Sequence, residues 1–299
     1  MNFCKMKQGV FSWMSGMAMQ CMFVFLFLVA MLGSVHLSAA KLEGAVIAET
    51  ARADSAFRIL PRRVAHVRIA RSDGTSCQLQ FAYDEQGRVV SMRKKAGSPA
   101  DGGASDARVR DVAIVYTPDR VTAAGAGHRV VCGLTDGRAV TVVEAWDETM
   151  EFSGESAGTY TYDRHGYLAG STFENENVEY AESYAMVDGA FVGMRRDVEG
   201  QVLLAECEND PEQLNNLNID LFGLDEFLFY GNFSSVLLYG IGGRRVHTLP
   251  AQIVYRWMES TDAPEYRTYE YEMAGEYIAA VEVCDERGGW TRLDFSYEQ

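Results

Sequence analysis

Tyr83-Asp84-Glu85-Gln86-Gly87-Arg88-Val89 and Tyr162-Asp163-Arg164-His165-Gly166-Tyr167-Leu168 are the two stretches that decide the fold. Each reads as an aromatic strand end, a four-residue turn and the start of a returning strand. An Asp at the turn entry can accept bonds from backbone N–H groups two residues on, and Gly can adopt the positive φ that closes a hairpin. Both stretches therefore predict β-hairpins, with Asp84, Gly87, Asp163 and Gly166 as the turn-forming residues. Looser copies follow at 197–202, 271–277 and 284–290.

Apolar and polar residues alternate between these turns, which is typical of antiparallel strands with one buried face. The segment 77–83, for example, places Cys77, Leu79 and Phe81 on one face and glutamines on the other. Short strands separated by turn signals favour a meander, because a parallel sheet needs a crossover helix between strands. The predicted strands are 63–69, 77–83, 89–95, 109–116, 129–132, 139–146, 159–162, 178–187, 190–196, 251–257, 266–272, 277–284 and 290–297.

One segment departs from this alternation. Asp210 is a good N-cap, Pro211 suits the first helical position, and leucines recur at spacings of three and four. The pattern predicts one short helix near 211–228, although three asparagines and Gly223 weaken it. Its Leu and Phe face should plug or flank the sheet. The leucines are Leu214, Leu217, Leu221, Leu224 and Leu228.

These elements define a mainly β fold. Near a dozen strands in about 235 residues are enough for one sizeable core. An open sheet of that size tends to curl or close, because its twist accumulates and its edges invite aggregation. We therefore expect residues 63–299 to form a single curled or barrel-like antiparallel meander. The sequence does not choose between an open curled sheet and a closed barrel.

The first forty residues look like an export signal. Lys5 and Lys7 precede an apolar run from Cys21 to Val35, and Ser38-Ala39-Ala40 supplies the small residues of a cleavage site. We expect a signal peptide over 1–40, a linker over 41–62, and a location in the periplasm or at the cell surface. The alternative is an uncleaved anchor, since the run is close to the span of about 20 residues that a bilayer needs. Contact with a membrane is then expected only through this N-terminal segment.

The charge balance limits the partners. The chain has 27 basic and 42 acidic residues; without Lys5 and Lys7 the exported part carries 25 − 42 = −17. Such a surface repels phosphate backbones, so nucleic acid is not an expected partner. An unidentified envelope component or extracellular ligand is the expected one.

Four cysteines remain after the predicted cleavage site. An exported protein can form disulfides, and four cysteines allow three pairings that the sequence does not rank. Apolar neighbours surround several of them, so buried free thiols are an equal alternative. The residues are Cys77, Cys132, Cys207 and Cys284.

The hairpin units resemble two known groups. Tyr-Asp-x-x-Gly-Arg-Val and Tyr-Asp-x-x-Gly-Tyr-Leu are similar to the YD repeats of the RHS class, but only two units are sharp and they lie 79 residues apart, from Asp84 to Asp163. The wider resemblance, over roughly 63–299, is to exported Bacteroidetes domains of unknown function. It takes in Asn218–Leu221, Leu249-Pro250 and the closing Tyr-x-Tyr and Phe-x-Tyr strands. This resemblance implies a porin-like β fold and an envelope location, and it implies no activity. Many of those domains look like lipoproteins, whereas this chain has no cysteine where lipidation would occur.

One motif suggests catalysis. Gly154-Glu155-Ser156-Ala157-Gly158 matches the G-x-S-x-G nucleophile elbow, in which the serine sits between a strand and a helix. Here a strand pattern follows instead, so a serine hydrolase using Ser156, with His165 or His247 as the base, is the alternative hypothesis. The histidines are isolated from one another, and we predict no metal site and no cofactor.

Four aromatic pairs are spaced two residues apart and so share a sheet face. Such pairs usually pack across strands and contribute about 0.2–1 kcal/mol each. The second interpretation is a stacking platform for a glycan or another flat ligand. We expect an exported binding or interaction module that is not an enzyme; a purely structural envelope protein is a further alternative. The possible ligand-facing residues are Phe81, Tyr83, Tyr160, Tyr162, Tyr269, Tyr271, Phe295 and Tyr297.

Overall fold

The computed structural model describes residues 58–97, 109–125, 127–146, 154–175, 178–224, 234–258 and 260–298. The chain divides into two units, 1–49 and 50–299. The predicted signal peptide, and the linker up to residue 57, lie outside the described residues. No helix in the described ranges has both the length and the apolar character needed to cross a membrane.

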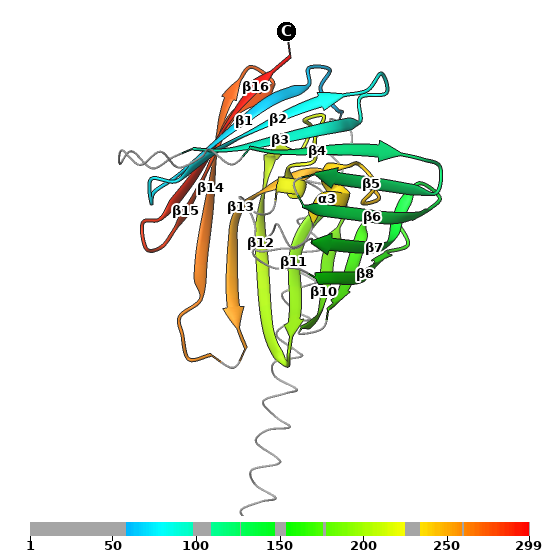
Figure 1. The fold of residues 1–299 in the computed structure, drawn as a ribbon. Helices are drawn as coiled ribbons and strands as arrows, with labels where there is room; N and C mark the ends of the chain where they lie inside the picture. Colours follow the sequence, from blue (N-terminus) through cyan, green and yellow to red (C-terminus); the bar gives the residue numbers. More distant parts are fainter. Residues whose placement is uncertain are drawn as a thin grey trace, which may run out of the picture. The chain divides into compact units, whose positions relative to one another are not determined.

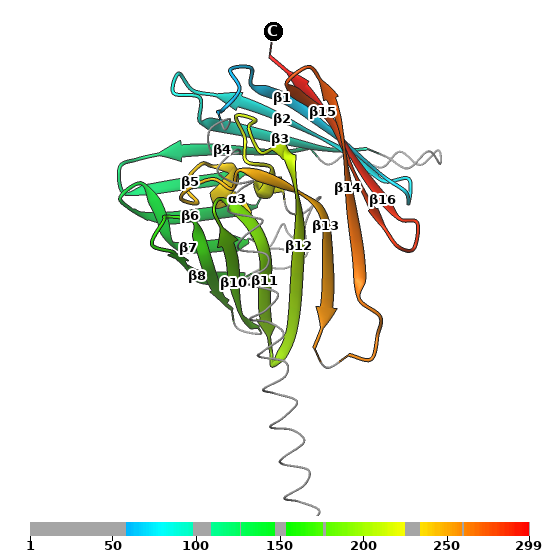
Figure 2. The same cartoon turned by 180° about the vertical axis from the view of Figure 1, so that it is seen from behind.

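The described part of the second unit is a closed barrel of sixteen antiparallel strands. Each strand pairs with its neighbours in chain order, and the last strand pairs with the first, so the sheet has no open edge. Figures 1 and 2 show this order from opposite sides. The mainly β meander is thereby confirmed, and the closed barrel is the form it takes. The strands are β1 (Val64–Arg71), β2 (Ser76–Tyr83), β3 (Val89–Gly97), β4 (Val109–Tyr116), β5 (Arg120–Gly125), β6 (His128–Thr135), β7 (Arg138–Trp146), β8 (Gly154–Tyr162), β9 (Leu168–Glu174), β10 (Glu179–Val187), β11 (Ala190–Val198), β12 (Gln201–Leu214), β13 (Thr248–Trp257), β14 (Glu265–Ala274), β15 (Tyr277–Asp285) and β16 (Trp290–Tyr297).

Three strands have no counterpart among the predicted ranges: β5, β9 and β12. The alternation in β5 ends in Ala123, Ala124 and Gly125, and β9 begins inside the second Tyr-Asp unit. These short or small-residue patterns give little periodic signal. β12 continues to Leu214, into the segment where the sequence predicts a helix.

The structure contains a short helix, as predicted, but its bounds differ from 211–228. The described residues of this range begin as the end of β12, pass through a loop, and form only the 3₁₀ helix η1 (Leu221–Leu224); the short α-helix α3 (Ser234–Leu238) comes later. Asp210 does accept a bond from a backbone N–H, that of Glu212 at 2.9 Å, but it does so at a bulge where β12 still pairs with β13. The leucine spacing reflects burial in the core, since Leu217 and Leu221 are fully buried.

The two Tyr-Asp units form the same turn. The N–H of Gly87 donates to the Asp84 carbonyl at 3.0 Å, and the Asp84 side chain accepts from the N–H of Arg88 at 2.9 Å. Gly87 has φ 80°, which favours glycine. Asp163 and Gly166 repeat these contacts, and Gly166 has φ 88°. The turn chemistry of each unit is therefore local, and it fixes the hairpin register.

The strands point apolar side chains inward and polar side chains outward. In β2, Leu79 and Phe81 are buried while Gln78 and Gln80 are exposed. Buried residues from all the strands and from the segment between β12 and β13 form one core cluster. Large exposed hydrophobic side chains are scattered over the described residues, most of them near strand ends: Ile59, Val115, Val143, Trp257, Met258, Tyr266, Met273 and Trp290.

Residues 215–247, called the insert below, join β12 to β13; 215–224 and 234–247 are described. The described residues of the insert bond to one end of the barrel. The Ile241 carbonyl of the insert accepts a hydrogen bond from Ala139 N at 2.9 Å. Arg244 N donates to the Gly166 carbonyl at 2.7 Å, and His247 N donates to the Gly189 carbonyl. These partners lie where odd-numbered strands begin. We call this the capped end and the opposite end, where odd-numbered strands finish, the open end.

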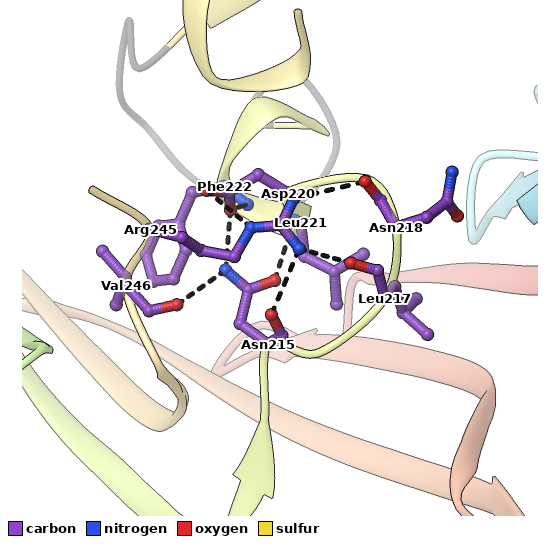
Figure 3. Close-up of polar contacts among 8 residues, drawn as sticks. All are labelled: Asn215, Leu217, Asn218, Asp220, Leu221, Phe222, Arg245 and Val246. Atoms are coloured by element: carbon purple, nitrogen blue, oxygen red, sulfur yellow. Dashed lines mark hydrogen bonds and ion pairs between the residues drawn. The ribbon is translucent and has the colours of Figure 1, made fainter. Parts of the chain in front are cut away.

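A buried polar network holds the insert together (Figure 3). The Asn215 amide donates to Asp220 Oδ1 at 2.7 Å and to the Val246 carbonyl at 3.0 Å, and Asn215 Oδ1 accepts from Leu221 N at 3.1 Å. Arg245 lies 3.7 Å from Asp220 and also donates to carbonyls of the loop. Burial raises the pKa of Asp220, and the Arg245 guanidinium opposes that shift. The loop conformation thus depends on satisfying groups that have no access to water.

Candidate ligand pocket at the open end

The eight predicted ligand-facing aromatics all belong to the core. Phe81, Tyr160, Tyr269 and Phe295 are buried members of the cluster, and the remaining four tyrosines are half-buried against it. Each of these four donates its hydroxyl to a backbone carbonyl at the start of a strand. The bonds are Tyr83 to Val64 at 2.6 Å, Tyr162 to Ala139 at 2.7 Å, Tyr271 to Pro250 at 2.7 Å, and Tyr297 to Ile278 at 2.5 Å.

These four tyrosines fasten neighbouring strands at the capped end. Arginine guanidinium groups lie over several of the rings, including Arg63 over Tyr83 at 5.5 Å and Arg138 over Tyr162 at 5.2 Å. Burial raises the pKa of both Tyr83 and Tyr162 to about 12, so both phenols remain hydrogen-bond donors at neutral pH. Their hydroxyl groups are thus engaged by the protein itself, and none of the eight aromatics lines the pocket described below.

Ser156 lies within β8, and the residues of the G-x-S-x-G match continue as strand. The strand–turn–helix geometry of a nucleophile elbow is therefore absent at this position. His165 is exposed in a hairpin turn, and His247 is buried at the capped end beside Gly189. Ser156 pairs with Glu144 near the open end, so the chain topology separates it from both histidines proposed as bases.

The alternation of β8 gives the G-x-S-x-G residues another role. Gly154, Ser156 and Gly158 are two residues apart and share the inward face. A Cβ atom at Gly158 would lie 3.0 Å from the Phe173 ring and 3.1 Å from Val142, which places this glycine against inward side chains of the adjacent strands. Gly158 therefore lets neighbouring strands approach closely, whereas Gly154, with no atom within 4 Å of a built Cβ, and the small Ser156 leave space on the inner face of β8.

A pocket of about 200 Å³ occupies this region at the open end. It is lined by residues from four consecutive strands and the β9–β10 turn. The polar lining groups are Ser156, Glu144, Glu174 and Asn175, and the lining contains no Lys or Arg. The other lining residues are Trp146, Phe173, Val178 and Tyr180.

Two aromatic stacks bound the pocket on either side of β8. Trp146 stacks on His128 with centroids 5.3 Å apart and planes at 9°, and Phe173 stacks on Tyr180 at 5.1 Å and 15°. Tyr160 meets the edge of Phe173 at 5.9 Å, which joins the second stack to the core. Parallel stacking of this kind fixes ring orientation, so the walls are rigid.

The polar groups of the pocket are only partly satisfied by the protein. Ser156 is 7 % exposed and has no hydrogen-bond partner within the described residues. Its cross-strand neighbour Glu144 lies 3.7 Å from Nε2 of His128 and is mostly buried. Asn175 uses its side-chain oxygen on Val178 N at 2.9 Å. The Ser156 hydroxyl is not among the buried side-chain atoms that lack a partner, so it opens into the pocket, beside the Glu144 carboxylate, where a ligand could bond to it.

A second polar cluster lies deeper, on the inner faces of β9, β10 and β11. The Glu182 side chain is fully buried, forms an ion pair with Arg196, and accepts a bond from the Tyr184 hydroxyl. Ser171 is within 3.2 Å of that hydroxyl. Burial, followed by the charge of Glu182, raises the pKa of Tyr184. The polar groups of this cluster therefore bond to one another on the inner face of the barrel.

The four cysteines of the described part form no disulfide, and its Cys, His and acidic side chains form no metal-binding group. Cys77, Cys132, Cys207 and Cys284 are free thiols; Cys132 is buried, and the other three are half-buried. Burial raises the pKa of Cys132 to about 12. Within the described ranges, no group of three His, Cys, Asp or Glu side chains is arranged to hold a metal ion.

Sequence reasoning did not single out Trp146, Phe173, Tyr180 or Glu144. The G-x-S-x-G match contained a signal for the pocket: Gly154 and Ser156 stand two residues apart on one face of a strand, and both are too small to fill that face. The aromatic residues flanking that gap come from strands brought together only by the barrel topology.

Comparisons with known proteins bear on the fold alone. No family model matches the chain, and no curated protein matches it. The fold is a closed, porin-like antiparallel barrel. The chain is similar in structure to a porin-like protein from Bacteroides uniformis, with a TM-score of 0.60 and 16% sequence identity; the match covers 81% of this chain and 100% of that one. A porin-like protein from Bacteroides vulgatus gives TM-score 0.61 and 14% identity over 79% and 99%. The porin-like fold implied by the sequence resemblance is thereby confirmed.

Proposed function

We propose that this protein is an exported, water-soluble barrel of the cell envelope that binds a small ligand at its open end, without catalysis and without forming a pore. The export pattern of residues 1–40 and the similarity in fold to porin-like Bacteroides proteins support the location. The main support for a water-soluble barrel that forms no pore is which side chains face outward and which face inward.

A membrane-spanning barrel turns an apolar band about 25 Å tall toward the lipid and polar residues toward its lumen. This barrel has the opposite arrangement. Along β8 and β9 the outward residues include Glu155, Thr159, Thr161 and Thr172, all exposed, while the inward Phe173 is buried. Placing such an outer face in hydrocarbon would leave charged and hydroxyl groups without water, at several kcal/mol for each charged group near the midplane.

The interior also differs from that of a channel. Barrels of 16 strands with a polar lumen hold water along their axis. Here the insert contributes fully buried side chains, including Leu217, Leu221 and Phe222, to the same core as the strands, and it bonds to the barrel at the capped end. An insert packed against the core at the capped end, with a pocket at the open end, suits binding better than conduction.

The test of this proposal is detergent-phase partition of the mature protein together with conductance in planar bilayers. We expect the protein in the aqueous phase and no stepwise conductance. Recovery in the detergent phase with unitary current steps would contradict the proposal and support a pore.

The hydrolase alternative has its own test. A fluorophosphonate probe should leave Ser156 unlabelled, because the serine lies in a continuous strand without the strand–turn–helix geometry of a nucleophile elbow. Labelling that disappears in Ser156→Ala and persists in Ser183→Ala, an exposed serine on β10, would favour the hydrolase.

A further inference from the structure

We propose that the open-end pocket takes a small organic cation that carries a hydroxyl or N–H donor, of the quaternary ammonium alcohol or amine class. This inference rests on the proposed binding function and names the ligand class of the same site. It is carried by the charge of the lining, by its aromatic walls and by the unpartnered Ser156.

The charge of the lining is one-sided. Glu144 and Glu174 both line the pocket, and no Lys or Arg does. The nearest arginine on the neighbouring inner face, Arg196, is paired with Glu182 and is not among the lining residues. A negative, partly enclosed pocket concentrates cations and repels anions, and the acidic surface of the exported chain acts in the same direction.

The walls suit a cation without a hydration shell. Trp146 stands on one side of the β8 gap and Phe173 on the other, each held by a stacked neighbour. Aromatic faces attract ammonium groups, most strongly for Trp, and aromatic cages are the usual recognition of quaternary ammonium. Within the described residues, no group of three His, Cys, Asp or Glu side chains is arranged to hold an inorganic cation.

The polar floor supplies the second point of recognition. Ser156 and Glu144 are direct cross-strand partners in β8 and β7, which places their Cβ atoms about 4.5–5.5 Å apart. One hydroxyl or N–H group of a ligand can therefore donate to Glu144 while bonding with Ser156. At about 200 Å³ the pocket is smaller than the roughly 300–1000 Å³ typical of drug-sized ligands, so it fits a small molecule.

The experiment compares three ligands by calorimetry on the protein purified from cells that export it, at pH 7.5. Choline has the charge and the hydroxyl, 3,3-dimethylbutan-1-ol has the same shape without the charge, and methyl glucoside is a neutral sugar. We expect choline to bind at least about tenfold more tightly than the neutral alcohol and the sugar. This comparison uses the unaltered protein, so it does not depend on any variant folding.

Variants then assign the contacts. Glu144→Gln should weaken choline binding by about tenfold, and Ser156→Ala by about three- to tenfold. Glu155→Gln is the matched control, because Glu155 is exposed on the outer face of β8 beside Ser156, and it should leave binding unchanged. Equal effects of Glu144→Gln and Glu155→Gln would overturn the assignment, since both remove the same net charge.

The failures of the two proposals are distinguishable. If methyl glucoside or the neutral alcohol binds as tightly as choline, the ligand class is overturned while the binding function stands. If no probe binds and the protein stays in the aqueous phase, the organic-cation inference is again overturned. If no probe binds and the protein enters detergent and conducts, the proposed function itself is wrong.

Discussion

Replacement of Asn215 by alanine should be among the most destabilising single changes in the insert. The side chain is fully buried and makes three hydrogen bonds, to Asp220 Oδ1, to the Val246 carbonyl and from Leu221 N. Each bond contributes about 1 kcal/mol net, and the buried partners that remain pay part of their desolvation, so the expected loss in the free energy of unfolding is about 3–5 kcal/mol. The adjacent Asn216 supplies the control, because its side-chain oxygen is buried without a hydrogen-bond partner among the described residues.

The measurement is equilibrium unfolding in urea, followed by far-UV circular dichroism and by tryptophan fluorescence on both variants. Asn216→Ala should change the free energy of unfolding by no more than about 0.5 kcal/mol, since it removes no side-chain bond. A loss below about 1 kcal/mol for Asn215→Ala, or equal losses for the two variants, would refute the assigned role of the network. Unchanged m-values would show that the comparison concerns the folded state.

Three further predictions concern single groups. Tyr162→Phe should lower the free energy of unfolding by about 1 kcal/mol, because the Ala139 carbonyl loses the hydroxyl that donates to it. Tyr266→Phe, on the exposed face of β14, should leave the free energy of unfolding unchanged. Urea unfolding of the two variants makes this comparison. Burial raises the pKa of Tyr83 and Tyr162 to about 12, above the value near 10 of the unfolded chain. The contribution of these two phenols to stability is therefore intact below about pH 10 and is lost as the pH rises toward 12. Tyrosinate absorbance of the folded and the unfolded protein should show this difference in pKa, and coincident titrations would contradict it. Because Cys132 is a buried free thiol, Ellman's reagent should react with it only after the protein unfolds. Fast reaction of Cys132 in the folded protein would contradict its burial. Absence of a free thiol in the unfolded, unreduced protein would contradict its being unpaired.

Local chemistry made the hairpins predictable. Asp84 and Gly87 specify their turn through bonds within five residues, and the period of two in 77–83 specifies which side chains are buried. Such signals lie entirely inside a short window of sequence. Closure of the barrel depends instead on β1 pairing with β16, more than 200 residues away, and no local pattern encodes that pairing.

The insert shows why the short helix does not begin at Pro211. Asp210 and Pro211 start a helix only if the following residues gain more from i to i+4 bonds than from other partners. Here Asn215 finds partners in Asp220 and in the carbonyl of residue 246, which is distant in sequence. Leu217, Leu221 and Leu224 keep a helix-like spacing because they are buried in the core. A spacing of three and four therefore reports burial, and the chain conformation follows from which polar groups can be satisfied.

The aromatic residues at the two ends of the barrel have different roles. Those at the capped end bond to the backbone of neighbouring strands, and those at the open end line the pocket. Tyr83 and Tyr162 donate to strand-start carbonyls at the capped end, so their rings and their polar atoms are both used in fastening strands. At the open end, Trp146 and Phe173 border a strand whose inner residues are too small to fill the space between them. Regular aromatic spacing along one strand marks the first kind. The second kind is marked by a gap in an intervening strand, so the residues that leave space, more than those that fill it, indicate where this barrel can bind.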